Sequence, residues 1–321
     1  GRRWAKFAKE LARRGHPVHV IRSIVPKQGT PLLWTTDVHH PNIIAHPLPR
    51  RYPTVLMKQP LDRFLDKVMY RAWLRLLPLL TRGNWYDRTI FWRKQLLREA
   101  GKTIAKHGIR NVIVTGAPFS LMTYASGLKH RFPKVNLVAD LRDPWTWGSH
   151  YGYGSIGPRR MDRERANEAL VASTFDKLTA PSASVIDHLQ RSHGGAPERY
   201  IHLPHTIDPD EYAPLAGTRA QDSLFRMIYA GSLYDREETA RYFQELFRAF
   251  LRMRHERPSA FPDYRMAHYL TGQGADELHR KAQEQDLQDM IHFHDPVAPK
   301  EVLRHGISTP AIFFSMPART A

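Results

Sequence analysis

Cysteine is absent from the sequence, which excludes disulfides, cysteine-ligated zinc and catalytic thiols and is compatible with a cytoplasmic protein. Long hydrophobic runs are absent too: no segment approaches the roughly 18 apolar residues of a membrane-spanning helix, and no signal peptide opens the chain. The motifs Gly-x-Ser-x-Gly, Walker A and His-Glu-x-x-His do not occur. We therefore expect a soluble or peripherally attached protein that uses none of these chemistries.

Acidic residues are in the minority, with 31 Asp and Glu against 48 Lys and Arg, a net charge of +17 and a pI near 10.2. Such a balance indicates attraction to an anionic partner, which is a nucleic acid, a membrane surface or a phosphorylated ligand. No compact nucleic-acid recognition motif accompanies the charge. We therefore expect no nucleic-acid partner.

The 321 residues exceed what one hydrophobic core usually serves, so two domains are expected. Helical and strand patterns alternate along the whole chain, which predicts the α/β class. A proline-bearing segment near Pro209 separates residues 1–208 from residues 209–321. Strands are predicted at 18–21, within 41–49, at 111–115, at 136–141, at 177–180, within 199–214, and at 225–230, 265–271, 291–294 and 311–315. Helices are predicted near 4–11, 61–77, 92–107, 120–132, 161–173, 183–192, 237–254, 276–285 and 299–305.

Both ends of the chain depart from a complete α/β plan. The sequence opens on a helix, whereas such a domain normally begins with a strand and a glycine-rich turn, so we expect further residues before Gly1. The second domain stops just after a strand, and we expect it to be incomplete.

The segment NLVADLRDPWTW at 136–147 reads as a buried parallel strand followed by a loop. Asp140, Arg142, Asp143 and Trp145 fall at the carboxyl end of this strand, where ligands bind in open α/β sheets. Carboxylates accept hydrogen bonds from sugar hydroxyls, and Arg binds phosphate with two N–H groups. The sequence thus predicts a site for a polyhydroxylated, charged ligand; an Arg–Asp pair that only holds the loop is the alternative.

Glycines follow several predicted strands. Gly116 ends one strand in the first domain, Gly231 and Ser232 end another in the second, and Gly272 and Gly274 follow the next. Because glycine lets a ligand approach backbone N–H groups closely, Gly116, which precedes a predicted helix, is a candidate binding position.

Residues 60–98 combine apolar side chains at helical spacing with Lys and Arg, and between 47 and 110 basic residues outnumber acidic ones by 15 to 4. Aromatic residues lie within and beside this stretch. Three interpretations stay open: an interfacial membrane anchor, a helix packed on its own domain, and a docking surface for another protein.

The 18 histidines include three close pairs, the last being His292 and His294. Zinc needs three or four converging ligands, and no third ligand is evident beside any pair. We predict no metal site.

Four motifs in order resemble the GT-B nucleotide-sugar glycosyltransferases, and in particular the retaining, glycosyltransferase family 4-like enzymes that build polysaccharides and glycolipids. They are VTGAPFS at 114–120, DLRDPW at 140–145, TAPSASVIDHL at 179–189 with LPHTIDPDEY at 203–212, and IYAGSLYDRE at 228–237. His205 and Thr206 stand where this family usually has Asn-Gly.

The resemblance implies two Rossmann-like domains that face each other across a cleft. Residues 1–208 would form the acceptor side, with a basic amphipathic insertion at about 60–98, and residues 209–321 would form part of the nucleotide-sugar domain. It also implies hexosyl transfer with retention, without a metal or a cofactor other than the nucleoside diphosphate sugar donor. The acceptor would be a polysaccharide, a glycolipid or another anionic or lipid-linked molecule at the inner face of the membrane.

The resemblance assigns roles to the candidate residues as well. Arg142, Asp143 and Arg236 would be catalytic; Gly231, Ser232, Gly272 and Gly274 would bind the donor; Gly116, Asp140 and Trp145 would bind the acceptor. The paired glutamates that usually hold the donor sugar would lie beyond Ala321. A non-catalytic nucleotide-sugar or anionic-ligand binding protein on the same scaffold is the alternative.

Overall fold

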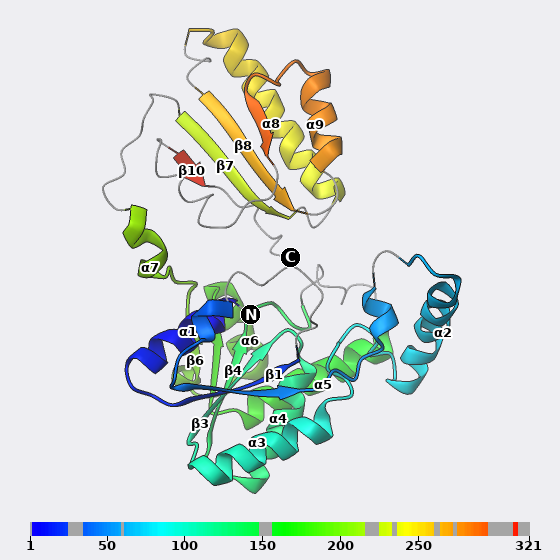
Figure 1. Ribbon diagram of the computed structural model, residues 1–321, viewed down its shortest axis with the longest axis vertical. Coiled ribbons are helices and arrows are strands. Elements are labelled where there is room, and N and C mark those ends of the chain that lie inside the picture. The colour runs from blue at the N-terminus through cyan, green and yellow to red at the C-terminus, as the bar shows by residue number, and fades with distance from the viewer. Residues whose placement is uncertain are drawn as a thin grey trace. The chain divides into compact units, whose positions relative to one another are not determined.

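The computed structural model describes residues 2–24, 35–58, 61–147, 156–215, 225–232, 236–259, 264–271, 275–294 and 311–313. These residues form two compact units, unit 1 up to Thr206 and unit 2 from Ile207 onward. Each unit contains a parallel sheet with helices packed around it (Figure 1).

The main sheet of unit 1 has four parallel strands in the order β3-β4-β5-β6. A separate parallel pair precedes it. The strands are β1 (Val18–Ser23), β2 (Ile43–Leu48), β3 (Asn111–Gly116), β4 (Asn136–Leu141), β5 (Lys177–Ala180) and β6 (Tyr200–His202). Leu137, Ala139 and Leu141 on one face of β4 and Asp140 on the other are almost fully buried, as expected for a parallel strand covered on both faces.

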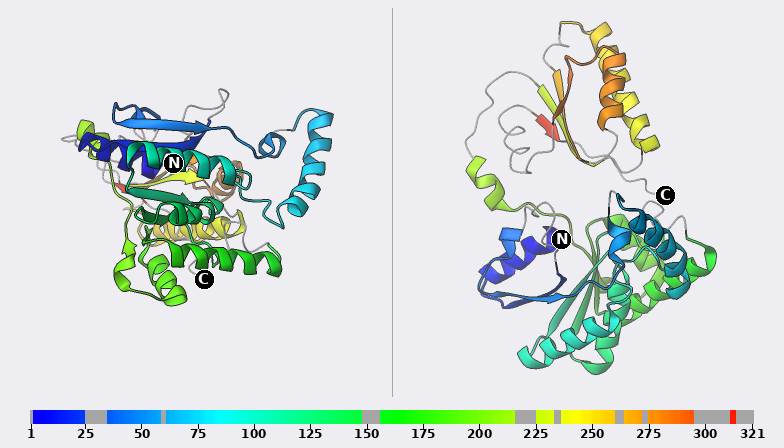
Figure 2. Two further views of the ribbon diagram at one scale, coloured as in Figure 1. Left: turned by 90° about the horizontal axis from the view of Figure 1, so that it is seen from below. Right: turned by 45° about the vertical axis from the view of Figure 1, so that its right-hand side comes forward.

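The helices of unit 1 pack on its strands, except the helix at residues 64–80, which projects from the unit (Figure 2). They are α1 (Arg2–Arg13), α2 (Phe64–Leu80), α3 (Arg93–His107), α4 (Ser120–Arg131), α5 (Pro158–Thr174) and α6 (Ala183–His193), with short 3-10 turns η1 (Thr35–Val38), η2 (Thr54–Met57) and η5 (Pro197–Arg199). One hydrophobic cluster joins β4 and β5 to α4, α5 and α6. Helix α2 contributes only Leu77 to the buried residues.

Local sequence explains where several helices begin and end. Gly108 closes α3 in the left-handed conformation at φ +62°, and its N–H donates to Ile104 O, because glycine carries no Cβ to clash there. Pro158 starts α5, where a missing N–H costs nothing. Ser182 occupies the position before α6, but its hydroxyl pairs with the Ser184 hydroxyl at 2.7 Å rather than with a backbone N–H.

Unit 2 has a four-stranded parallel sheet in the order β10-β7-β8-β9. Its elements are α7 (Pro209–Tyr212), η6 (Ala213–Leu215), β7 (Phe225–Ser232), α8 (Arg236–Glu256), β8 (Tyr264–Thr271), α9 (Ala275–Glu284), β9 (Ile291–His294) and β10 (Ala311–Phe313). Phe243, Phe247 and Phe250 lie on one face of α8 and are buried against α9, which is the spacing of an amphipathic helix.

The predicted α/β class is confirmed, since both units have parallel sheets whose strands are linked through helices. The helix predicted at 299–305 lies outside the described residues. Among the described residues, no helix combines the length and the hydropathy needed to cross a membrane.

Candidate functional site

The carboxyl ends of β3, β4 and β5 meet around Asp140, whose side chain is 0% exposed. Thr115 and Thr179 are its neighbours in register, and their hydroxyls donate to Asp140 Oδ2 at 3.1 Å and to Oδ1 at 2.9 Å. Trp4 Nε1 of α1 also donates to Oδ2, at 2.6 Å. A buried carboxylate needs such partners to offset the hydration that it loses on burial. Asp140 therefore holds α1 against the edge of the sheet from inside the protein.

Arg3, beside Trp4, extends this network to the end of β6. Its Nη2 donates to Leu203 O at 2.7 Å and lies 3.5 Å from Asp140 Oδ1, and its Nη1 donates to Pro204 O at 3.1 Å. The guanidinium also lies 3.4 Å from His205 Nδ1. Arg3 thus anchors the segment that carries the LPHT motif, a role that no local pattern in the sequence indicated.

Arg142 braces the turn that follows β3. Its backbone N–H and its Nε both donate to Gly116 O, at 3.1 and 3.2 Å, and its Nη2 donates to Ala117 O at 2.5 Å. A guanidinium has five N–H donors, so donors remain for a ligand after these bonds are made. Arg142 and Gly116 are therefore brought together, as the sequence predicted for one sheet edge.

Gly116 has a steric reason to be glycine. A Cβ atom placed on it would lie 2.6 Å from Phe119 Cδ1, closer than carbon atoms can pack, and 3.1 Å from Met122 Cε, which is a tight contact. Phe119 fills this space from the start of α4 and is buried. The turn is tight because of internal packing, and contact between Gly116 and a ligand stays a prediction.

A carboxylate already occupies the N-terminus of α4. Asp87 is buried, and its Oδ2 accepts from the Ser120 N–H at 2.8 Å while its Oδ1 accepts from Thr89 N and Oγ1 at 2.8 and 2.6 Å. A negative charge is favourable at this end of a helix, but it also repels a second anion. No local sequence pattern indicated the role of Asp87, because it lies 33 residues before its partner Ser120.

Asp143 differs from its neighbours at this edge. Its side chain is half-buried, and within the described part of the chain it forms neither a hydrogen bond nor an ion pair. It follows directly after Arg142, which the two carbonyl contacts hold in place. Of Asp140 and Asp143, the two acidic residues predicted for the site, only Asp143 has no hydrogen-bond partner in the described structure; its contact with a ligand stays a prediction.

Trp145 is buried and belongs to the core. Its ring stacks on Phe119 with centroids 4.7 Å apart, and its Nε1 donates to Glu164 Oε2 at 2.8 Å. Glu164 also accepts from Tyr86 OH at 2.8 Å and pairs with Arg160. Burial and then the charge of Glu164 raise the pKa of Tyr86. Trp145 shapes this edge through packing, and contact with an acceptor stays a prediction.

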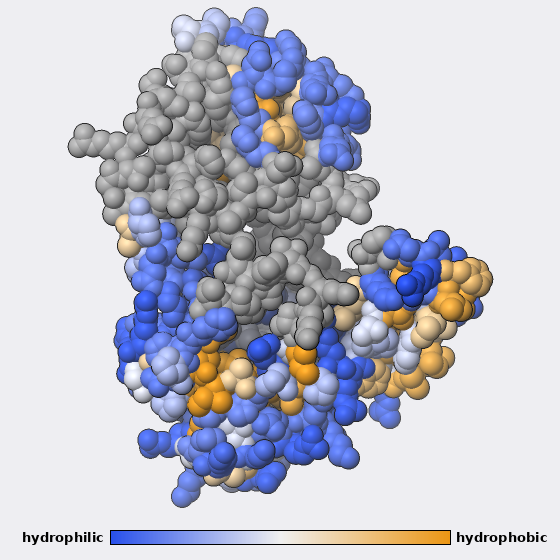
Figure 3. All heavy atoms as spheres, in the orientation of Figure 1, coloured by the Kyte–Doolittle hydropathy of each residue, from blue (hydrophilic) through white to orange (hydrophobic). Residues whose placement is uncertain are grey.

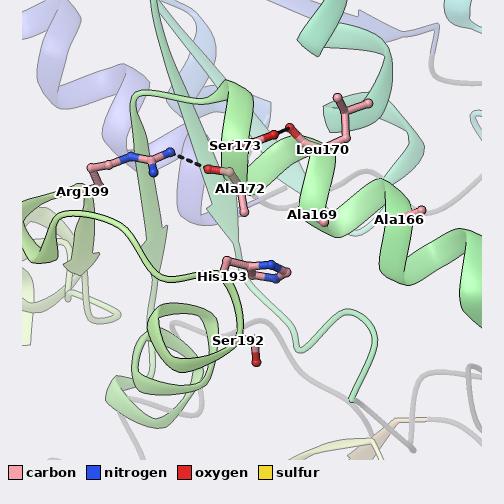
Figure 4. Close-up of a pocket in the computed structure, with 8 residues that line it drawn as sticks. All are labelled: Ala166, Ala169, Leu170, Ala172, Ser173, Ser192, His193 and Arg199. Atoms are coloured by element: carbon pink, nitrogen blue, oxygen red, sulfur yellow. Dashed lines mark hydrogen bonds between the residues drawn. The ribbon is translucent and has the colours of Figure 1, made fainter.

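A shallow hollow lies elsewhere in unit 1, between α5 and α6 (Figure 4). It is lined by Ala166, Ala169, Leu170, Ala172, Ser173, Ser192, His193 and Arg199. The Arg199 guanidinium donates to the carbonyls of Ala172 and Phe175, so it caps the C-terminus of α5. Because the Arg199 guanidinium is bound to these two carbonyls, we do not assign a binding site to this hollow.

The donor-side candidates belong to unit 2. Gly231 and Ser232 are the last residues of β7 and pair in register with Leu270 and Thr271 of β8. Arg236 is the first residue of α8; its side chain is outside the described part of the structure. The unit therefore has a parallel strand followed along the chain by a helix, and the N-terminus of such a helix presents free backbone N–H groups. Gly272 and Gly274 lie outside the described residues.

Metal ligands do not converge in the part of the chain that the structure describes, where no group of three or more His, Asp or Glu side chains is arranged to hold an ion. The rings of His292 and His294 lie 6.4 Å apart on β9.

No protein-family model and no curated protein matches the chain. Several solved structures are similar to it. The lipopolysaccharide outer core galactosyltransferase WaaB is 11% identical over 68% of this chain and 52% of its own, with a TM-score of 0.44. Sucrose-phosphate synthase from Thermosynechococcus elongatus is 13% identical over 96% of this chain and 67% of its own, with a TM-score of 0.48.

A third similar structure, the UDP-GlcNAc 2-epimerase from Neisseria meningitidis bound to UDP-GlcNAc, is 12% identical over 86% of this chain and 71% of its own, with a TM-score of 0.41. The chain spans about half of the length of WaaB, at 52%. At these identities the similarities concern the fold, and they include both transferases and epimerases.

Proposed function

We propose that this protein is a glycosyltransferase that moves a hexosyl group from a nucleoside diphosphate sugar to a carbohydrate or lipid-linked acceptor at the cytoplasmic face of a membrane. The observation that carries the proposal is the order of β7 and α8, in which Gly231 and Ser232 end a parallel strand and Arg236 begins a helix of 21 residues. The four ordered sequence motifs give the reaction class.

The chemistry of the donor side follows from this geometry. When the bond between the sugar and the diphosphate breaks, negative charge grows on the leaving group. Backbone N–H groups and the positive end of the α8 dipole stabilise such charge without reorganisation. Arg236 adds a full positive charge at the same end of the helix, so it would be the main side chain that stabilises the charge on the departing diphosphate. Gly272 and Gly274, after β8, would complete the donor site.

The acceptor side would be the carboxyl edge of β3 to β5. Asp143 has an unpaired carboxylate in the described structure and would accept a hydrogen bond from the attacking hydroxyl. Arg142 would hold an anionic group of the acceptor with the N–H donors that it does not use on Gly116 and Ala117. Asp140 would act as a positioning residue through its buried hydrogen bonds.

Donor turnover separates this proposal from a non-catalytic binding protein. The full chain is titrated with UDP-glucose, UDP-N-acetylglucosamine and GDP-mannose by calorimetry, and release of nucleoside diphosphate is followed in parallel. The proposal predicts binding and release for at least one donor. Binding of a donor without release, in the presence of oligosaccharide and lipid-linked acceptors, would support the binding-protein alternative instead.

Arg236→Ala tests the donor-side assignment. Loss of one preorganised charge donor typically lowers kcat by about 100- to 1,000-fold, whereas Arg241→Ala on the same helix should leave kcat unchanged. Arg241 is an exposed residue in the described structure, so it is a matched control for removal of one positive charge. Equal rates for the two variants would remove Arg236 from the mechanism.

Retention and metal independence are proposed from the motif resemblance. Proton NMR of the first product formed would show whether the anomeric configuration of the donor is kept, and an inverted product would contradict retention. Activity that persists in excess EDTA is expected, because Arg236 and the helix dipole would supply the positive charge; full loss of activity that Mg²⁺ or Mn²⁺ restores would overturn this point.

A further inference from the structure

Helix α2 exposes an unusually large apolar surface for a helix of unit 1. Among the described residues, 18 large hydrophobic side chains are exposed, and eight of them lie on these 17 residues, each between 43% and 78% exposed. They are Phe64, Leu65, Val68, Met69, Leu74, Leu76, Leu79 and Leu80. Isolated exposed apolar residues are ordinary, but a contiguous patch marks a contact surface.

The exposed side chains gather on one side of the helix. At 100° per residue, a sector of about 160° holds Phe64, Leu65, Val68, Met69, Ala72, Leu76, Leu79 and Leu80. Arg75 lies just inside the Phe64 side of this sector, and the exposed Leu74 lies outside it. Leu77, the buried residue of α2, points away from the centre of this sector. The helix contacts η2. Figure 3 shows the hydrophobic residues gathered over this helix, which projects from unit 1 in Figures 1 and 2.

Cationic residues border the apolar sector. Lys67, Arg71 and Arg75 recur at every fourth position, so they form one ridge along its edge. All three are exposed, and in the described part of the chain none of them forms an ion pair. Asp66, in contrast, is paired with Lys58 at 3.0 Å. The charge that α2 offers to a partner is therefore positive.

We infer that α2 is a docking surface for an anionic membrane, on which the helix lies along the interface with its apolar sector among the acyl chains. A protein groove would cover the apolar sector, but it gives no reason for a ridge of three cations along one side of it that form no ion pair in the described structure. A second copy of this chain, with its own +17 charge, would bring two such ridges together. An anionic lipid surface accounts for both the apolar sector, which its acyl chains cover, and the cationic ridge, which its headgroups bind.

The position of α2 connects this surface to the candidate acceptor edge. Asn84, four residues after α2, donates from Nδ2 to Ser120 Oγ at 3.1 Å, and Asp87 binds the Ser120 N–H. Ser120 begins α4, directly after the turn that Arg142 braces. If the proposed function holds, a docked α2 would bring that edge close to lipid-linked acceptors; docking itself does not depend on sugar transfer.

Vesicle co-sedimentation of the full chain tests the inference. Vesicles of phosphatidylcholine with 30% phosphatidylglycerol, or of phosphatidylcholine alone, are compared at low and physiological salt. We expect binding to the anionic vesicles that is at least tenfold tighter than to the neutral ones and that weakens as salt rises. Equal binding to both vesicle types, or no binding to either, would overturn the inference.

Two triple variants separate the apolar and the cationic contributions. Lys67→Gln with Arg71→Gln and Arg75→Gln should weaken binding to anionic vesicles about a hundredfold, since each cation near such a surface contributes about fivefold. Leu65→Gln with Met69→Gln and Leu76→Gln should weaken it at least tenfold. The matched control replaces Ile44, Leu170 and Ile201 by Gln, which are similarly exposed on other elements. Equal loss in the control would overturn the assignment to α2.

A fluorescent label reports the depth of insertion directly. Because the chain has no cysteine, the variants Leu79→Cys and Leu170→Cys can each be labelled at their one cysteine with an environment-sensitive dye. The dye at 79 should shift to the blue on anionic vesicles and be quenched by doxyl lipids, while the dye at 170 should do neither. Sedimentation velocity tests whether a second copy of the chain covers α2 instead. A dimer that dissociates in the Leu65→Gln, Met69→Gln, Leu76→Gln variant, together with no quenching of the dye by doxyl lipids, would overturn the inference.

Discussion

Replacement of Asp140 by Asn tests whether this residue organises the sheet edge of unit 1. The carboxylate is fully buried and accepts hydrogen bonds from Trp4, Thr115 and Thr179, with Arg3 3.5 Å from Oδ1. Asn keeps one of the two carboxylate oxygens and replaces the other by an NH₂ group, which cannot accept the hydrogen bonds that this second oxygen received. At least one buried donor then loses its acceptor, and Arg3 loses its opposite charge.

The expected cost follows from these contacts. A hydrogen bond to a charged group contributes about 1.5–3 kcal/mol, and removal of one partner of a buried charge pair costs about 3–5 kcal/mol. Because Asn retains part of the network, we expect a loss of about 3 kcal/mol. For a unit of this size, each kcal/mol shifts Tm by about 2–4 °C, which predicts a decrease of about 6–12 °C for the transition of unit 1.

Differential scanning calorimetry of the full chain measures this shift. Asp187→Asn is the matched control, because Asp187 is an exposed aspartate of α6 in the same unit and its change alters the net charge equally; we expect a shift below about 2 °C there. A decrease for Asp140→Asn no larger than that of the control would refute the view that this carboxylate holds the edge together.

Three further predictions concern other parts of unit 1. Gly116→Ala should lower stability by about 1–3 kcal/mol in urea unfolding, because the new Cβ would press on Phe119; an unchanged midpoint would contradict this. Burial opposes ionisation of Asp176, but the Lys129 and backbone hydrogen bonds outweigh it and lower its pKa. This contribution is present above the ordinary Asp pKa and is lost as pH falls through the lowered value, so the Tm gap between wild type and Lys129→Met should shrink below about pH 4; a constant gap would argue against the pair. Burial, with the nearby His107 and His46 charges, lowers the pKa of His19, so stability should fall as pH drops below about 6, and a His19→Gln variant should lose part of that dependence.

Much of the fold was predictable because strong periodic patterns identify long elements. The core face of α8 and the buried run of β4 are examples, and both follow the predicted spans closely. The role of Asp140 was harder to predict. A parallel strand buried on both faces has no alternation of polar and apolar residues, so its sequence does not show whether a polar residue at its end points into the core or toward a ligand.

The partners of the site residues were not predictable from local patterns. Trp4 lies 136 residues from Asp140, and Asp87 lies 33 residues from Ser120; such pairs depend on the packing of distant elements. The sequence did place Gly116 and Arg142 each at the carboxyl end of a parallel strand, and such ends meet at one edge of a sheet; their direct contact was not predicted.

The pattern of α2 predicted a helix but left its surroundings open. Amphipathic spacing is the same whether a helix packs on its own domain or faces outward. The exposed fractions of Phe64 and Leu79, 78% each, decide between these cases for the described structure, and they could not be read from the sequence.

A crystal structure of the full chain with UDP or GDP would locate the diphosphate. Our proposal predicts diphosphate density against the backbone N–H groups between Gly231 and the first turn of α8, within hydrogen-bond distance of the Arg236 guanidinium. A diphosphate bound only elsewhere, or no nucleotide density at saturating concentration, would contradict the proposal that this protein transfers sugars from nucleotide donors.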